Sequence, residues 1–122
     1  MASKLIFVVE DDDAVRNSTG TLLEALGYTA RVFPTAELLL SQADGQSCDC
    51  LVLDHHLPGI SGLDLLEALR ANGVTTPAIM ITGNGPHLEE RAARAGALAT
   101  LRKPLSADLL SQWLEKVFAP KS

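Results

Sequence analysis

The stretch Leu5-Ile-Phe-Val-Val-Glu-Asp-Asp-Asp13 joins five apolar residues directly to four acidic ones. A short apolar run without alternation is typical of a strand that is buried on both faces of a sheet. The acidic residues follow at the point where this strand reaches its carboxyl end. The stretch therefore predicts a buried strand that delivers charged side chains to one edge of a sheet.

The rest of the chain alternates between similar apolar runs and segments with helical spacing of apolar residues. Five strand–helix units with short connections are typical of an open, mostly parallel sheet with helices on both faces. We therefore predict a doubly wound α/β fold. The expected strands are 5–9, 28–33, 50–53, 78–81 and 98–101, and helical spacing covers 15–26, 36–43, 63–69, 88–95 and 109–118.

Length and composition limit the class of protein. The chain has 122 residues, of which 47% are hydrophobic and 20% charged, as expected for one folded domain and not for a disordered segment. Ten basic against fifteen acidic residues give a net charge of −5, which argues against direct binding of nucleic acid. No stretch approaches the ~20 apolar residues that span a bilayer. Cys48 and Cys50 are too close to favour a disulfide, so we expect a reduced, cytoplasmic protein.

Polar residues follow four of the five expected strands. Glu10 and Asp11 come after the first, Asp54 after the third, Thr82 after the fourth and Lys103 after the fifth. In open parallel sheets, ligands bind in the crevice at the carboxyl ends of the strands. We therefore expect these residues, distant in sequence, to meet at one edge of the sheet.

The residue types at this edge point to phosphoryl chemistry. A cluster of carboxylates suits a hard cation, and a site with few protein ligands suits Mg²⁺. Asp54 would then be a nucleophile that attacks a phosphoryl group, while Thr82 and Lys103 stabilise charge on its oxygens. For Asp12 and Asp13 a simpler function is expected, because acids favour the amino end of a helix.

Four motifs in this order resemble the receiver domain of two-component response regulators over residues 5–118. They are Val8-Val-Glu-Asp-Asp12, Leu51-Val-Leu-Asp54 with Leu57-Pro-Gly-Ile-Ser-Gly62, Ile81-Thr-Gly83 and Lys103-Pro104. The segment 82–85 is most similar to receivers with a LuxR-type DNA-binding output. The resemblance implies a flavodoxin-like fold with strand order 2-1-3-4-5, and we expect residues 1–122 to form a single receiver domain.

The resemblance also implies the central reaction. Asp54 would be the phosphoacceptor, taking its phosphoryl group from the phosphohistidine of a sensor histidine kinase or phosphotransfer protein. Mg²⁺ would be bound by the carboxylates of Asp11 and Asp54, by the backbone carbonyl of His56, and by Glu10 through a water molecule. The chain would catalyse only its own phosphorylation and dephosphorylation.

Further residues are assigned by the same resemblance. Thr82 would donate to the phosphoryl group and Lys103 would pair with it. Gly83, Asn84 and Pro104 would modulate the site, with a cis bond before Pro104, and His56 and Asn84 would flank the path of the attacking water.

Three positions depart from the family pattern, one of which is His56, two residues after Asp54. Thr100 occupies the switch position, where receivers usually have an aromatic residue, and Leu105 replaces an aromatic residue common after the proline. The signal would pass to a partner through the face made by the fourth helix, fifth strand and fifth helix. The resemblance also allows a homodimer through the fourth helix and fifth strand.

Three alternative functions require sequence features that can be compared with this chain. An aspartyl phosphatase needs a second acid two residues after its nucleophile, where this chain has His56. A flavin or nucleotide binder needs a Gly- or Ser/Thr-rich loop after the first strand, where this chain has four acids. A docking module that works without phosphorylation is favoured only by Thr100 and Leu105. A zinc site at His55 and His56 is disfavoured, because the usual ligand spacings do not occur.

Overall fold

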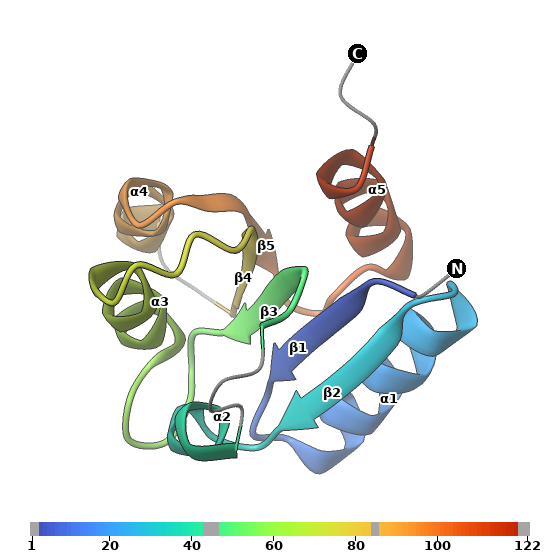
Figure 1. Ribbon diagram of the computed structural model, residues 1–122, viewed down its shortest axis with the longest axis horizontal. Coiled ribbons are helices and arrows are strands. Elements are labelled where there is room, and N and C mark those ends of the chain that lie inside the picture. The colour runs from blue at the N-terminus through green and yellow to red at the C-terminus, as the bar shows by residue number, and fades with distance from the viewer. Residues whose placement is uncertain (1–2, 43–46, 84–85, 120–122) are drawn as a thin grey trace.

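One parallel sheet forms the centre of the molecule. The computed structural model describes residues 3–42, 47–83 and 86–119. Its strands lie in the order β2-β1-β3-β4-β5, which confirms the expected flavodoxin-like topology (Figure 1). The strands are β1 (Leu5–Val9), β2 (Thr29–Phe33), β3 (Cys50–Asp54), β4 (Ala78–Thr82) and β5 (Ala97–Arg102).

Helices cover both faces of this sheet. Helices α1 and α5 pack on one face, and α2, α3 and α4 pack on the other (Figure 1). This division follows from the right-handed crossover of each strand–helix–strand unit. The helices are α1 (Asp13–Ala25), α2 (Ala36–Gln42), α3 (Gly62–Ala71), α4 (Pro86–Arg94) and α5 (Ala107–Val117).

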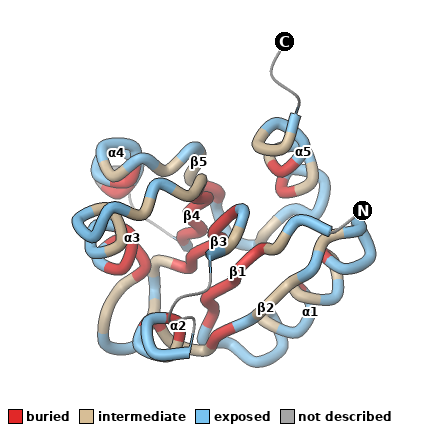
Figure 2. Tube along the Cα trace, viewed as in Figure 1, coloured by how far each residue is buried: buried red, intermediate tan, exposed pale blue. Residues whose placement is uncertain are grey.

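Two hydrophobic clusters, one on each face, hold the layers together. The central strands β1, β3 and β4 are buried along almost their whole length (Figure 2). Successive side chains of a strand point to opposite faces, so Leu51 and Leu53 join the cluster under α2–α4 while Cys50 and Val52 join the one under α1 and α5. Cys48 packs against the first cluster and Cys50 lies in the second, and both thiols are free.

The expected strands are confirmed, with small shifts at their ends. Strand β3 extends one residue to Asp54 and β4 one residue to Thr82, so both side chains belong to the rigid sheet. Helix α4 begins at Pro86, two residues earlier than expected.

Not every apolar residue of the helical segments expected from the sequence is buried. Val15 and Leu26 of the first helical segment, Leu40 of α2 and Leu109 of α5 have side chains that are about two-fifths exposed, at 39–43%. Each helix rests on the sheet along a narrow line, so only residues that point directly at the strands are buried. Residues on the flanks of the stripe stay in contact with solvent where no second helix covers them.

Gly62 places the start of α3 against the end of β3. A Cβ atom added at Gly62 would lie 2.1 Å from the backbone oxygen of Asp54 and 3.0 Å from the Cα of His55. The backbone N–H of Gly62 also donates to the carbonyl of His55, at 3.1 Å. Ser61 caps the helix by accepting from the N–H of Asp64. The loop after Asp54 therefore closes tightly because residue 62 has no side chain.

We expect Gly62→Ala to lower the free energy of unfolding by about 1–3 kcal/mol or more, because backbone atoms must move to admit the methyl group. Urea unfolding followed by circular dichroism measures this. Gly20→Ala in α1 is the matched control, since its added Cβ meets only the exposed side chain of Val32 at 3.3 Å. Helix propensity then favours alanine. Equal losses in the two variants would contradict the close packing at Gly62.

Candidate functional site

Three carboxylates meet at the carboxyl edge of the sheet, as the sequence predicted. The oxygen atoms of Glu10, Asp11 and Asp54 lie within 4.8 Å of one another. Glu10 and Asp54 are almost completely buried, at 4% and 1% exposure, whereas Asp11 is exposed. Among the described residues this is the only group of three side chains that could bind a metal ion. Closely spaced oxygen donors fit a hard divalent cation such as Mg²⁺.

The sheet itself fixes these positions. Hydrogen bonds continue the strand pairing beyond the strand ends: the N–H of Glu10 donates to Phe33 at 3.0 Å, and the N–H of His55 donates to Ile81 at 2.8 Å. The N–H of Lys103 donates in the same way to the carbonyl of Thr82, at 2.9 Å. The first residues after β1, β3 and β5 are therefore held by backbone hydrogen bonds.

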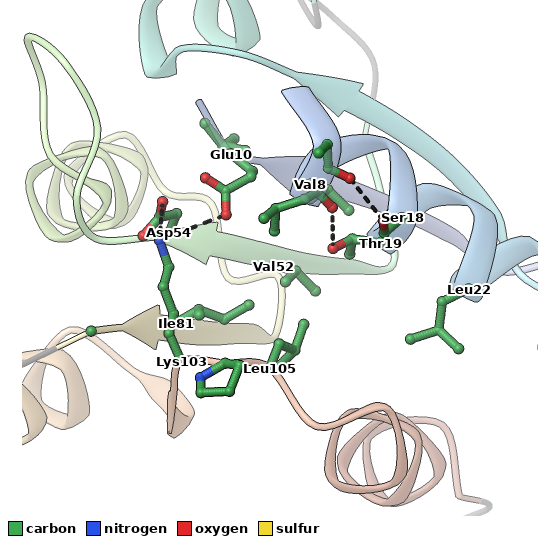
Figure 3. A pocket seen from close by; sticks show the side chains of 15 residues that line it. Val8, Glu10, Ser18, Thr19, Leu22, Val52, Asp54, Ile81, Lys103 and Leu105 are labelled. Atoms are coloured by element: carbon green, nitrogen blue, oxygen red, sulfur yellow. Dashed lines mark hydrogen bonds and ion pairs between the residues drawn. The ribbon is translucent and has the colours of Figure 1, made fainter. Parts of the chain in front are cut away.

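Lys103 is the cation that approaches the buried acids. Its Nζ lies 2.9 Å from Oδ2 of Asp54 and 3.7 Å from Oε1 of Glu10, as Figure 3 shows. The other oxygen of Asp54 accepts from the backbone N–H of His56 at 3.1 Å. Glu10 also accepts from the N–H of Asp12 at 3.2 Å. A single ammonium group thus faces three carboxylates.

Burial and repulsion change the protonation of this cluster. The pKa of Glu10 is raised from its ordinary value of 4.5 to about 7. Burial is the largest cause, and the hydrogen bond and charge of neighbouring Asp54 also raise this pKa, whereas the Asp12 N–H lowers it. Burial works to lower the pKa of Lys103, but its hydrogen bond to Asp54 and the nearby acids outweigh burial and raise it. Without a metal ion, the site therefore relieves its excess negative charge by retaining a proton on Glu10 near neutral pH.

Asp12 and Asp13 have the simpler function expected for them. Asp12 is the N-cap of α1 and accepts from the N–H of Val15 at 3.0 Å. Asp13, in the first turn, pairs with Arg16 at 2.5 Å. The guanidinium of Arg16 also donates to the backbone carbonyl of Glu10 at 3.0 Å, so it anchors the segment that carries the acids.

The other residues that the sequence assigned to the site differ in burial and in position. Thr82 ends β4 and is 2% exposed, while His56 and Gly83 are exposed on adjoining loops. The bond before Pro104 is cis, as expected. Asn84 lies outside the described residues. Thr100 is half-buried in β5 opposite Met80, away from the acid cluster and one strand beyond β4.

Histidines and cysteines form no metal site in the described part of the chain. His55 is half-buried, and its Nδ1 has no hydrogen-bond partner among the described residues. Burial and the adjacent His56 lower the pKa of His55, which keeps its ring neutral. The two rings meet edge to face, with centroids 5.1 Å apart.

A cavity beside the acids was not anticipated from the sequence. It has a volume of about 680 Å³ and lies between α1 and the loop after β5, over the ends of β1, β3 and β4 (Figure 3). Glu10, Asp54 and Lys103 line one end, and apolar side chains of α1 and of the sheet line the rest. Val15, an apolar residue in the first helical segment, lines this cavity and is 41% exposed, and no sequence signal distinguishes it from a core residue.

Helix α4 has few buried anchors. Among its described side chains, Leu88 and Ala92 are buried, and Arg91 forms an exposed ion pair with Glu67 of α3 at 3.3 Å. Beyond its carboxyl end, the guanidinium of Arg70 donates to the carbonyls of Ala95 at 2.8 Å and Gly96 at 3.4 Å. Arg94 pairs with Glu90 within the helix. Both arginines of α4 are thus paired with acids of this chain.

Comparisons with known proteins agree with this geometry. A model of the response regulator receiver domain family matches residues 6–115. The chain is 34% identical over 111 residues to the transcriptional regulatory protein FixJ of Bradyrhizobium diazoefficiens, covering 90% of this chain and 54% of that protein. It is 31% identical over 109 residues to the response regulator protein TodT of Pseudomonas putida, covering 88% and 48%. The chain thus spans about half the length of these relatives.

Solved structures give the same result. A CheY-like response regulator receiver domain protein from Methanospirillum hungatei superposes with a TM-score of 0.86 at 31% identity, over 95% of this chain and 94% of that one. The response regulator StyR superposes with a TM-score of 0.86 at 35% identity, over 94% and 59%. Within the described residues, every helix is too short or too polar to cross a membrane.

The raised pKa of Glu10 has a measurable effect on stability. The folded protein keeps the proton of the Glu10 carboxyl group up to about pH 7, whereas the unfolded chain releases it near pH 4.5. The free energy of unfolding therefore falls as pH rises from 4.5 to 7, and it stays at the lower value above pH 7. The slope is at most about 1.4 kcal/mol per pH unit for one proton. Glu10→Gln should remove this fall and be more stable than wild type at pH 8.

Urea unfolding at several pH values between 5 and 8, without divalent cations, tests this expectation. Glu24→Gln, at an exposed position of α1, is the control and should follow the wild-type profile. Parallel profiles for wild type and Glu10→Gln would show that Glu10 ionises as readily in the folded protein as in the unfolded chain.

Proposed function

Because the chain belongs to the response regulator receiver domain family of two-component signal transduction, we propose that Asp54 accepts a phosphoryl group from the phosphohistidine of a histidine kinase. The observation that carries the proposal is the 2.9 Å ion pair between Lys103 and Asp54 beside two further carboxylates. An oxygen of Asp54 attacks phosphorus, the bond from phosphorus to the imidazole nitrogen breaks, and an aspartyl phosphate forms. Lys103 and the Thr82 hydroxyl balance charge on the phosphoryl oxygens.

The acid cluster fits Mg²⁺, which we include in the proposal. Asp11 and Asp54 would hold the ion through carboxylates, Glu10 through a water molecule, and His56 through its backbone carbonyl. When bound, Mg²⁺ supplies positive charge for the phosphoryl oxygens. Without the ion, Lys103 alone does not offset the negative charge of the acid cluster, which repels a phosphoryl group, so phosphorylation should require Mg²⁺.

The fold and the family favour this function over an enzyme with a separate substrate and over a docking module. The chain is a receiver domain and not an enzyme with a separate substrate, and self-catalysed phosphorylation and dephosphorylation are the only chemistry we propose for it. A docking module that works without phosphorylation gains no support over this function, since Asp54, Thr82 and Lys103 lie together at strand ends that the sheet holds in place.

Partners and location follow from the same proposal. The phosphodonor is a sensor histidine kinase or phosphotransfer protein, and output uses α4, β5 and α5. A homodimer through α4 and β5 is supported by Leu98, which is 49% exposed on the edge strand. Arg91 and Arg94 pair with acids of the same chain, so they would have to exchange partners to bind across such a dimer. A cytoplasmic location is supported by the free thiols of Cys48 and Cys50.

Transmission of the signal must differ from that of receivers with an aromatic switch residue. Thr100 is too small to fill the space that an aromatic ring would occupy. Among the described side chains of α4, by contrast, Leu88 and Ala92 are the buried ones, and Arg70 forms hydrogen bonds beyond the carboxyl end of this helix. We propose that phosphorylation displaces α4, for which a coupling energy of ~1–3 kcal/mol suffices.

The first test is labelling. Wild-type protein incubated with acetyl phosphate and Mg²⁺ should gain the mass of one phosphoryl group in intact-mass spectrometry, because Asp54 is the buried nucleophile beside Lys103. Asp54→Asn should gain none, and omission of Mg²⁺ should abolish labelling of the wild type. Asp64→Asn, an exposed aspartate on α3, is the control and should label normally. Labelling of Asp54→Asn at the wild-type rate would refute the assignment.

The second test concerns the switch. Binding of beryllofluoride, a phosphoryl mimic, should change amide hydrogen exchange in α4 more than in β5, because α4 has the weaker packing. Thr100→Ala should keep this pattern and bind an output partner or second copy as wild type does. A Thr100→Ala variant that still labels but loses the α4 response would restore residue 100 as the switch.

A further inference from the structure

Arg16 holds the backbone of the turn between β1 and α1. Its Nη1 atom donates to the carbonyl of Glu10 at 3.0 Å and to the carbonyl of Asp11 at 3.4 Å. The backbone N–H of Arg16 donates to the carbonyl of Asp12 at 2.8 Å. Three successive carbonyl groups of the turn that carries the acids therefore accept hydrogen bonds from a single residue.

The guanidinium group of Arg16 is largely shielded from water. The side chain of Arg16 is 15% exposed, whereas Asp13, which pairs with it at 2.5 Å, is 84% exposed. An ion pair with so exposed a partner contributes little to stability. The hydrogen bonds to the turn are charge-assisted, and such bonds are stronger than those between neutral groups. Arg16 therefore acts mainly through the carbonyls of the turn and not through Asp13.

Asp11 depends on this turn more than the two buried acids do. Asp54 is part of β3, and the N–H of Glu10 continues the strand pairing by donating to the carbonyl of Phe33. Asp11 follows one residue after that bond and is exposed. A shift of the backbone at Asp11 therefore moves its carboxylate relative to the other two.

We propose that Arg16 is a positioning residue that gives the acid cluster its affinity for Mg²⁺ and its preference for Mg²⁺ over larger divalent cations. The inference rests on the Mg²⁺ site of the proposed function and adds to it a residue that is not a ligand. Mg²⁺ requires nearly ideal octahedral geometry with oxygens at about 2.0–2.1 Å, whereas Ca²⁺ accepts flexible ligands at about 2.3–2.6 Å. By fixing the carbonyls of the turn, Arg16 keeps Asp11 within the narrower range that Mg²⁺ needs.

The charge of Arg16 and its hydrogen bonds have opposite effects on cation binding. A guanidinium group near three carboxylates repels a cation that approaches them, so removal of the charge alone should strengthen the binding of any divalent cation. Loss of the hydrogen bonds should weaken binding, because residues that orient metal ligands typically contribute about tenfold or more to metal affinity. The two causes therefore predict changes of opposite sign in the Kd for Mg²⁺.

Titration of the metal-free protein with Mg²⁺ or Ca²⁺, followed by amide NMR, tests the proposal. Arg16→Met removes the charge and the donors, so its Kd for Mg²⁺ should rise by about tenfold. Its Kd for Ca²⁺ should rise less, so that the ratio of the Ca²⁺ Kd to the Mg²⁺ Kd falls. Arg16→Lys keeps the charge but not the planar fork of donors, and should give an intermediate Kd for Mg²⁺. The NMR signals of the folded protein report on folded molecules alone, so partial unfolding of a variant does not imitate lower affinity.

Arg102→Met is the matched control. Arg102 is exposed at the end of β5, beside Lys103, so this variant removes the same charge from the same edge of the sheet. Its Kd for Mg²⁺ should equal the wild-type value or fall below it. A Kd for Mg²⁺ in Arg16→Met that is no higher than in wild type, or an equal rise for Mg²⁺ and Ca²⁺, would overturn the inference. Wild-type protein whose amide signals do not respond to Mg²⁺ would instead overturn the cation site of the proposed function.

Discussion

Repulsion among three carboxylates that share one lysine is the constraint on which the site depends. Glu10 and Asp54 are almost fully buried, where charge is costly, and Lys103 compensates only part of it. The rigid sheet holds the acids together despite this cost, because backbone bonds fix the strand ends and Gly62 closes the loop after Asp54. Under the proposed function, a divalent cation relieves this repulsion, and its positive charge then offsets the negative charge of a phosphoryl group.

The fold could be predicted because its signals are local. Continuous apolar runs such as 5–9 mark buried strands, and strand ends in a parallel sheet meet at one edge, which brings Asp54 and Lys103 together although they are 49 residues apart. Burial on helix flanks could not be predicted, since it depends on the neighbouring helices. The cavity at Val15, the raised pKa of Glu10 and the close contact at Gly62 all require three-dimensional packing that no periodicity encodes.

The end of β4 connects the acid cluster to helix α4. Thr82 lies at the end of a buried strand, and α4 begins four residues later, so a charge that draws in the Thr82 hydroxyl acts close to the start of that helix. Arg70 holds the far end of α4 through the carbonyls of Ala95 and Gly96. A helix fixed at one end and weakly packed along its length can respond to phosphorylation without a rotating aromatic side chain.

Stabilisation by Mg²⁺ tests the central claim most directly. A ligand that binds only the folded state raises the free energy of unfolding by about 2.7 kcal/mol at a hundredfold excess over its Kd. In urea unfolding, Mg²⁺ should raise the free energy of unfolding of the wild type in this way, and Asp11→Asn should lose most of the increase. Asp13 pairs with Arg16 and lies outside the acid cluster, so Asp13→Asn should keep the increase. Equal stability with and without millimolar Mg²⁺, or an undiminished gain in Asp11→Asn, would contradict the claim that these acids form a cation site.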